Sequence, residues 1–390
     1  MLSLERAKAA PLTIHLNIRG LKRDPGFLDL LLPHHQKTRS LSVIKPVTID
    51  ELTQTLPNFP RSMPNLRSLD LSQYGLADWT QTVDPFDFSA HTLTELSLSD
   101  IPLYPSFLSL RSLTELSLVY CRFDLHVDTL LEFLEENHSL ERASLEIAFE
   151  EPSLRHSRRQ DPIGNRLQLL SISCHNATDS RALLSAIALR RGAALEIYCN
   201  AKLIKILSGV SVTHLQNLSS PTFMEYQTLP RTIRLVGPDG SFLFDGYSIS
   251  ENPFQEFPLL PLDSIREFRL EHYTRSTHAE LHLSSFPSLE VLAIDGTDSG
   301  VPLSTVLPDP ASSSLKTLAF LNCAITEGFV GELVRFASCC EKRTLASLHR
   351  VVIIDSSDEQ LPSVASIARL RKYVPAVEVR EGRELPKDLS

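Results

Sequence analysis

The chain has 390 residues, of which 42% are hydrophobic and 22% are charged, and its formal net charge is −9. This composition excludes wholesale disorder, and the acidic balance argues against a nucleic-acid backbone as the main ligand. A chain of this length forms either two or three domains or an elongated repeat array. The 25 prolines, set against only 14 glycines, favour many short elements separated by turns.

Cysteine usage and the N-terminal segment bear on the cellular compartment. The six cysteines form no C-x-x-C pair, and the first residues, MLSLERAKAAPL, lack the apolar core of a signal peptide. No apolar run approaches the ~20 residues that a membrane helix needs. We therefore expect a thiol-reducing compartment, the cytoplasm or the nucleus, and no contact with a membrane.

Residues 1–60 are predicted to form strands and a capping segment. Pro11–Ile18 alternates apolar and polar residues, which is typical of a strand, and Arg39–Ile44 is a second predicted strand. A short helix or turn is predicted at Gly26–Pro33 and a short helix at Ile49–Leu56.

The strongest pattern lies at Leu113–Phe123, which reads L-T-E-L-S-L-V-Y-C-R-F. It fits the template L-x-x-L-x-L-x-x-N/C-x-L at every defined position, and Leu315–Ile325 is a second full match. Leu116 and Leu118 alternate along a short strand, so both point to one side. One such unit cannot bury its apolar side alone, whereas stacked copies can. The sequence predicts an α/β fold, a leucine-rich-repeat solenoid with a curved parallel sheet and with helices and loops on its convex side.

Repeats at similar spacing divide the rest of the chain. The first block, residues 61–200, has repeats that begin in steps of 27, 20, 27 and 27 residues, at Leu66, Leu93, Leu113, Leu140 and Leu167. The second block, residues 263–380, has repeats that begin at Ile265, Leu289, Leu315 and Leu348. Residues 201–262 are predicted to be an irregular segment within the array, and residues 381–390 a frayed tail.

The connections between repeats are predicted to include helices and one hairpin. Helical spacing or helix end signals occur at Val127–Asn137, Asp179–Arg191, Thr326–Ser338 and Pro362–Tyr373. Further strands are expected at Ala194–Tyr198, Val212–Leu218 and Ala376–Val379. A hairpin is expected from Thr232–Val236 and Ser241–Phe244, because P-D-G separates them.

Five stretches carry a family likeness: Leu4–Leu16, Leu167–Ile197, Ser220–Tyr226, Phe257–Leu270 and Leu315–Cys323. Through them the chain resembles the leucine-rich-repeat region of a fungal (basidiomycete-type) F-box protein. The resemblance implies an array that recruits the substrates of a cullin ubiquitin ligase. In that family an F-box precedes the segment that Leu4–Leu16 resembles, and no F-box is recognisable here. Docking of a Skp-type adaptor is therefore expected only if an upstream F-box exists.

Candidate chemical sites are few. His278, Glu280 and His282 would share one face of a strand, but their spacing is not that of H-E-x-x-H, and a solvated strand face is the favoured interpretation. The pair Cys339 and Cys340 ends a predicted helix and suggests packing. Residues 155–159 carry three arginines and are interpreted as a solvated loop, because the chain is acidic. We predict no catalytic residues, no metal and no cofactor.

The inner face of the array remains as the candidate binding surface. Side chains that alternate with the strand leucines should point away from the core. In the first block they are polar or acidic: Asp70, Glu95, Ser97, Glu115, Ser117, Ser144 and Glu146, with Arg142 interrupting the row of glutamates. In the second block they are apolar: Ala319, Leu321, Val352 and Ile354. An exposed apolar patch is either covered by the chain's own tail or binds a partner.

The sequence thus favours a non-enzymatic module whose concave face binds a protein partner. The acidic half would steer a basic segment, and the apolar half would supply the strongest contacts. Two alternatives stay open. One is an enzyme of unrecognised type, and the other is an F-box-less relative with only a scaffold role.

Overall fold

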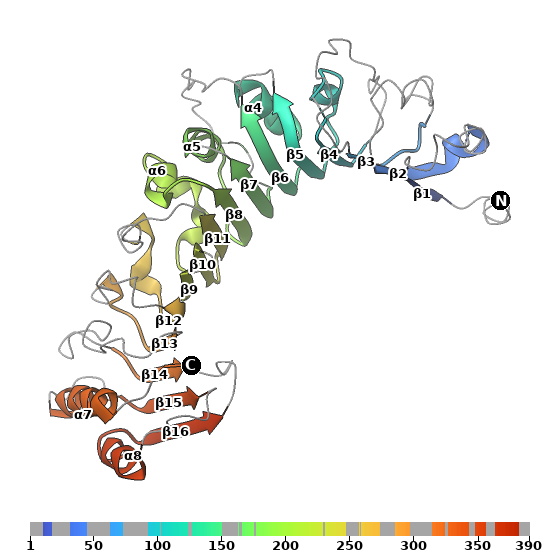
Figure 1. Ribbon diagram of the computed structural model, residues 1–390. Helices are drawn as coiled ribbons and strands as arrows, with labels where there is room; N and C mark the ends of the chain where they lie inside the picture. Colours follow the sequence, from blue (N-terminus) through green and yellow to red (C-terminus); the bar gives the residue numbers. More distant parts are fainter. Residues whose placement is uncertain are drawn as a thin grey trace. The chain divides into compact units, whose positions relative to one another are not determined.

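The computed structural model describes residues 11–17, 32–44, 63–72, 93–101, 103–123, 127–149, 163, 166–174, 177–228, 231–246, 257, 259–273, 285–296, 314–323, 327–342, 348–355 and 363–381. These residues form an α/β protein with sixteen strands, most of them parallel, and few helices (Figure 1). The predicted α/β class with a parallel sheet is confirmed.

The chain separates into two compact units. The first contains Met1–Arg190 and Gly209–His214, and the second contains Arg191–Ser208 and Leu215–Ser390. The division into repeat blocks that the sequence suggests remains a prediction.

The strands of the first unit pair in chain order, and every pair is parallel. They are β1 (Leu12–Asn17), β2 (Thr38–Ile44), β3 (Ser68–Ser72), β4 (Glu95–Ser99), β5 (Glu115–Phe123), β6 (Arg142–Phe149) and β7 (Leu169–Cys174). The strands predicted at Pro11–Ile18 and Arg39–Ile44 are confirmed as β1 and β2. The helix predicted at Ile49–Leu56 lies outside the described residues. The described residues of this unit also include two short 3-10 helices, η2 (Leu32–Lys37) and η3 (Phe107–Ser109).

The alternation of leucines decides which face of these strands forms the core. Leu116 and Leu118 are 2% and 0% exposed, whereas the intervening Ser117 is partly exposed. The helices α4 (Val127–Glu136) and α5 (Ala177–Ala186) lie on the same side of the strands in Figure 1. Both were predicted, and α4 buries an apolar face as expected. Helix α5 ends before the predicted Arg191.

The early end of α5 has a backbone cause. The Ile163 N–H donates to the Ala186 carbonyl at 2.8 Å, and the Ala188 N–H donates to the Ile163 carbonyl at 2.7 Å. These bonds place Ile163 and Ile187 in a parallel bridge. The residues after Ala186 therefore satisfy their backbone groups in a strand-like pairing instead of a further helical turn.

The Asn137 side chain connects the end of α4 to the segment directly before β5. Its side chain is 2% exposed, and its Oδ1 accepts a hydrogen bond from the Leu113 N–H at 3.1 Å. Its Nδ2 donates to the carbonyls of Leu110 and Phe133 at 3.0 and 2.9 Å. A buried amide with these partners satisfies backbone groups that a turn leaves free.

The same left-handed backbone conformation occurs directly after β4, within β5 and directly after β14. Asp100, Tyr120 and Asn322 have φ values of 56°, 51° and 53°, and each directly precedes the N/C position of the repeat template. At that position the Cys121 thiol donates to the Leu98 carbonyl at 3.5 Å, and the Cys323 thiol donates to the Ile294 carbonyl at 3.7 Å. At both positions the thiol thus forms a hydrogen bond with a carbonyl of the preceding strand.

The second unit begins and ends with parallel pairs. Its strands are β8 (Ala193–Cys199), β9 (Phe223–Thr228), β10 (Arg231–Gly237), β11 (Gly240–Gly246), β12 (Glu267–Tyr273), β13 (Val291–Gly296), β14 (Thr317–Leu321), β15 (Arg350–Asp355) and β16 (Ala376–Glu381). Strands β12 to β16 pair in chain order. The strands predicted at Ala194–Tyr198 and Ala376–Val379 are confirmed as β8 and β16.

Strands β9, β10 and β11 form an antiparallel meander within this parallel sheet. The predicted hairpin is confirmed, because β10 pairs antiparallel with β11 across Pro238 and Asp239. Strand β11 then pairs parallel with β8, and β9 pairs parallel with β12. The strand predicted at Val212–Leu218 is wrong. Those residues form the 3-10 turns η4 (Val212–His214) and η5 (Gln216–Leu218), which bury Leu215 and Leu218 at a spacing of three.

The remaining helices of the second unit are α6 (Leu203–Leu207), α7 (Glu327–Lys342) and α8 (Val364–Leu370), and a further 3-10 turn is η7 (Leu262–Ser264). The helices predicted at Thr326–Ser338 and Pro362–Tyr373 are thereby confirmed. The ring centroids of Phe320 and Phe329 are 5.0 Å apart, so α7 packs on the Phe320 side of β14. The Ser366 hydroxyl donates to the Glu327 carboxylate and joins α8 to α7.

Leu118→Ala tests whether the buried leucines carry the stability of the first unit. Leu118 is 0% exposed, so the change should cost about 2–5 kcal/mol in lost burial and cavity formation. The adjacent Ser117→Ala, on the other face of β5, should alter stability by less than about 0.5 kcal/mol. Urea unfolding followed by circular dichroism measures both. Equal effects at the two positions would contradict the assignment of the faces.

Candidate functional site

The outward face of the first unit carries one continuous row of small polar side chains. The strand register places His15, Ser42, Asp70, Ser97, Ser117, Ser144 and Ser171 side by side on β1 to β7. The sequence analysis predicted the part of this row that contains Asp70, Ser97, Ser117 and Ser144. Small side chains suit a row of strands only ~4.8 Å apart.

Glutamates lie on both sides of this row rather than on one. Glu95 pairs in register with Glu115, and Glu115 pairs with Arg142. Glu146 instead pairs with Val119 and Ser173, which lie beyond the row of serines. The expectation of a single row of Glu95, Glu115 and Glu146 was therefore wrong. The cause is the period of two, because Glu146 follows Ser144 whereas Glu95 and Glu115 precede their serines.

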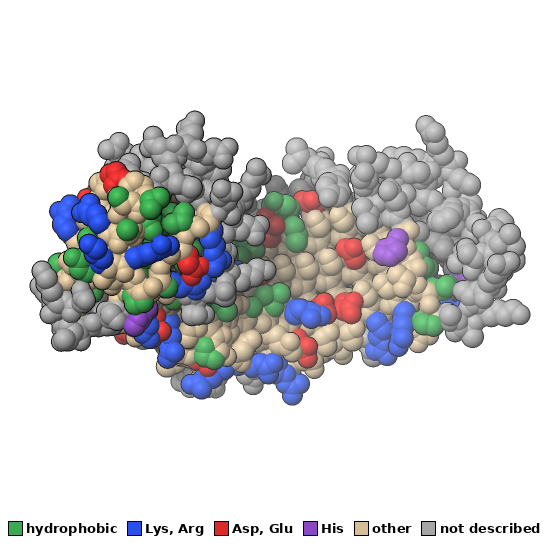
Figure 2. Space-filling view, turned by 90° about the horizontal axis from the view of Figure 1, so that it is seen from below, with side chains coloured by type: hydrophobic (Ala, Val, Ile, Leu, Met, Phe, Trp, Pro, Cys, Tyr) green, Lys and Arg blue, Asp and Glu red, His purple; other side chains and the backbone are tan. Residues whose placement is uncertain are grey.

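The polar groups of this face are partly paired with one another. The Ser42 hydroxyl donates to Asp70 Oδ2 at 2.8 Å, and Arg142 forms an ion pair with Glu115. The Arg142 and Glu115 side chains are 52% and 38% exposed, so the pair is solvated and adds little stability. In Figure 2, acidic and basic side chains lie beside each other on a mostly tan surface. This face of β3 to β6 is open and polar, and we name it the polar strand face.

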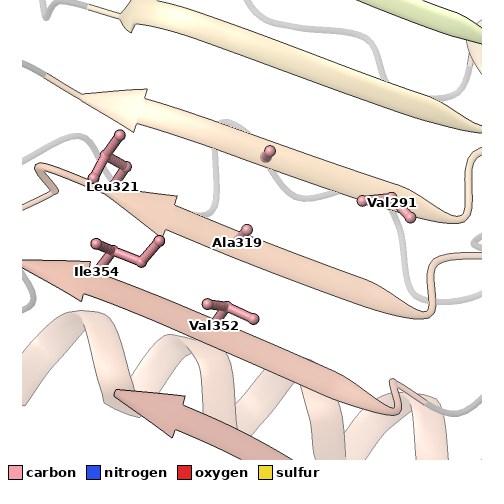
Figure 3. Packing of buried hydrophobic residues seen from close by; sticks show 6 residues of the cluster. Val291, Ala319, Leu321, Val352 and Ile354 are labelled. Carbon is pink, nitrogen blue, oxygen red and sulfur yellow. The ribbon is translucent and has the colours of Figure 1, made fainter. Parts of the chain in front are cut away.

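The apolar residues predicted for the second block are buried. Ala319, Leu321, Val352 and Ile354 are 0%, 3%, 0% and 2% exposed, and they form a cluster with Val291 and Ala293 (Figure 3). We name these six residues the apolar cluster. The expectation that these side chains form an exposed patch is thus not met in this chain. Their part in partner binding remains a prediction.

The sequence contained a signal for this burial. The core strands of this region read V-L-A-I, L-A-F-L and V-V-I-I without polar alternates. Continuous apolar runs are typical of parallel strands that are covered on both faces. The burial of all five residues of β14 agrees with this pattern.

A polar network that was not predicted lies on the outward side of β9, β10 and β12. Arg269 forms an ion pair with Glu267 at 2.7 Å, and its guanidinium carbon lies 5.4 Å from the ring centroid of Phe223. Gln227 Nε2 donates to Glu225 at 3.0 Å and to Glu271 at 2.8 Å. These residues belong to the segment without a repeat pattern and to its neighbour, so the template gave no reason to group them.

Two of the cysteines, Cys121 and Cys323, have thiols that are hard to ionise. Burial raises the pKa of both the Cys121 and the Cys323 thiol to about 12. A packing role was expected for the pair Cys339 and Cys340: Cys340 is buried on α7 and fits it, whereas Cys339 is exposed and does not. Among the described residues no group of three or more histidines, cysteines or carboxylates could hold a metal. His278, Glu280, His282 and the arginines of residues 155–159 lie outside the described residues.

No model of a protein family matches the chain, and no curated protein matches it. Within the described residues no helix is long and apolar enough to cross a membrane. The function must therefore be argued from the residues and their arrangement.

Thiol labelling tests the burial of the cysteines. Of the six, only Cys339 is exposed, so a disulfide reagent at pH 8 should modify one thiol rapidly and the others only after denaturant is added. Cys339→Ser should abolish the rapid phase. Rapid labelling of Cys121 or Cys323 in the native chain would contradict the packing of the turn.

The pH dependence of stability tests the ion pairs at the last two strands. Hydrogen bonding from Arg350, at 2.8 Å, is the main cause that lowers the pKa of Glu378, and Arg380 adds to it. A lowered folded-state pKa stabilises the protein above the unfolded value of 4.5, and this stabilisation is lost as the pH falls below it. Glu378→Gln should therefore lower stability at pH 7 and reduce its loss between pH 5 and 3. The comparison uses urea midpoints, and an unchanged acid sensitivity would contradict the pairing.

Proposed function

We propose that the protein is a non-enzymatic interaction module whose polar strand face binds a protein partner. We further propose that its strands are leucine-rich repeats that stack as a solenoid. Two features support this reading: the left-handed residue directly before Cys121 and before Cys323, and the hydrogen bond of each thiol to the preceding strand. A repeat fold of this kind uses its strand face as an extended binding surface.

The observation that carries the proposal is the contrast between the two faces of β3 to β6. The leucine side is almost fully buried, whereas the outward side presents Asp70, Glu95, Ser97, Glu115, Ser117, Ser144 and Glu146 in partly or fully exposed positions. Substitutions of exposed side chains on such a surface change the stability of the fold little. It is therefore the part of the first unit that is free to be adapted to a partner.

The charge of this face indicates the kind of partner. Among the described side chains of this face, four carboxylates, Asp70, Glu95, Glu115 and Glu146, stand against the guanidinium of Arg142. A basic segment of a partner would be attracted to it, and the attraction would weaken as salt screens it. Small serines between the carboxylates leave room for long lysine and arginine side chains to lie flat.

The family likeness adds a more specific proposal. The chain resembles the repeat region of fungal F-box proteins, so we propose that its partner is a substrate to be recruited to a ubiquitin ligase, in the cytoplasm or the nucleus. Binding of a Skp-type adaptor is proposed only for a form that carries an upstream F-box.

Charge reversal on the polar strand face tests the proposal. Glu95→Lys combined with Glu146→Lys should weaken binding to a lysine- and arginine-rich peptide library about tenfold, because rim charges set the steering and part of the affinity. Glu132→Lys combined with Glu135→Lys, on the exposed side of α4, is the matched control for net charge. Binding that falls equally in both pairs would show only an effect of total charge. Unchanged binding by the Glu95→Lys, Glu146→Lys variant would contradict the proposal that the polar strand face is the binding site.

A further inference from the structure

Tyr120 occupies a backbone position that suits its side chain poorly. Its φ of 51° lies in the left-handed region, where bulky residues are rare and aspartate and asparagine are enriched. The other two non-glycine residues with positive φ in the described part of the chain are Asp100 and Asn322, and both follow that preference. A tyrosine here is a local cost to the fold, and costs of this kind cluster at sites that bind ligands.

The backbone around Tyr120 also removes its side chain from the regular alternation of β5. The pairing of β5 with β6 shifts its register between Val119 and Cys121, so Tyr120 is an extra residue on β5. Bulges of this kind are common beside functional sites, where they redirect a side chain. Cys121 is buried, whereas the Tyr120 side chain is 53% exposed. An aromatic ring is thus held largely in solvent near the carboxyl end of β5.

A carboxylate lies on each side of this tyrosine along the sheet. Val119, directly before it, pairs in register with Glu146 of β6. On the other side, the N–H of Asp100, the residue directly after β4, donates to the Val119 carbonyl at 2.9 Å. Both carboxylate residues are partly exposed. Burial raises the pKa of Asp100, so a cation brought beside it would favour its ionised form.

We propose that Tyr120 is the aromatic anchor of the polar strand face and stacks with an arginine side chain of the partner, which Asp100 and Glu146 flank. A planar guanidinium stacks on aromatic rings and forms paired hydrogen bonds with carboxylates, whereas the ammonium of lysine is a point charge. Tyrosine and arginine are also enriched among the strongest contacts of protein interfaces. The inference rests on the proposed binding function of the polar strand face and names the side chain that this face selects.

Substitutions of Tyr120 in the full-length chain separate binding from folding. The probes are two peptide pools that differ only in having arginine or lysine at every basic position, and the unaltered chain should prefer the arginine pool. Tyr120→Asn should weaken binding of the arginine pool about tenfold, because the stacking is lost. It should leave the urea midpoint unchanged or raise it, because asparagine tolerates the left-handed backbone.

Two further substitutions at this position identify the aromatic face as the cause. Tyr120→Phe keeps the ring and should bind the arginine pool as the unaltered chain does. Tyr120→Leu keeps an apolar side chain without an aromatic face, so it should bind as weakly as Tyr120→Asn. Asp100→Asn keeps a residue suited to its backbone and removes only the charge, and it should weaken binding about threefold.

The outcomes distinguish this inference from the proposed function on which it rests. Equal binding of the two pools by the unaltered chain would overturn the arginine anchor, and so would a lower urea midpoint of Tyr120→Asn, which would assign the ring to packing. The Glu95→Lys, Glu146→Lys variant is measured in parallel. If it binds weakly while Tyr120→Asn binds normally, only the anchor is overturned. If both bind normally, the polar strand face is overturned as well.

Discussion

The constraint on which the structure depends is the period of two in parallel strands that pair in register. Because each strand shows alternate side chains to opposite faces, one set of leucines builds the core and the residues between them form a second surface. In the first unit the strands β1 to β7 pair in register along the row from His15 to Ser171, so the two faces stay separate across all seven strands. A single shift by one residue would bring serines into the core and leucines into water.

The same constraint produces two different surfaces in the two units. On β3 to β6 the outward residues are polar and half-exposed, so the face stays open to a partner. On β13 to β15 the outward residues are aliphatic and buried, so the sheet is covered on both sides. The change lies in the residues between the leucines, while the leucine positions themselves remain the same.

Much of the fold could be predicted because it depends on local pattern. The strands β5 and β14, the helices at Val127 and Glu327 and the P-D-G hairpin all follow from spacing and turn chemistry. The meander of β9 to β11 could not be predicted as a whole. Strand β11 pairs with β8, which is distant in the sequence, and no local pattern indicates that pairing. The burial of Leu321 and Ile354 was missed because alternation says which side a residue faces, not whether that side is covered. The neighbours of Glu146 could be assigned only from the register of β5, β6 and β7, which the structure gives.

Carboxylate footprinting of the chain with and without its bound partner tests the central claim most directly. Amidation of surface carboxylates reports the accessibility of each one separately. On partner binding, the account predicts lower labelling of Asp70, Glu95, Glu115 and Glu146, with Glu132 and Glu135 on α4 unchanged. Protection of the α4 carboxylates with no change on β3 to β6 would contradict it.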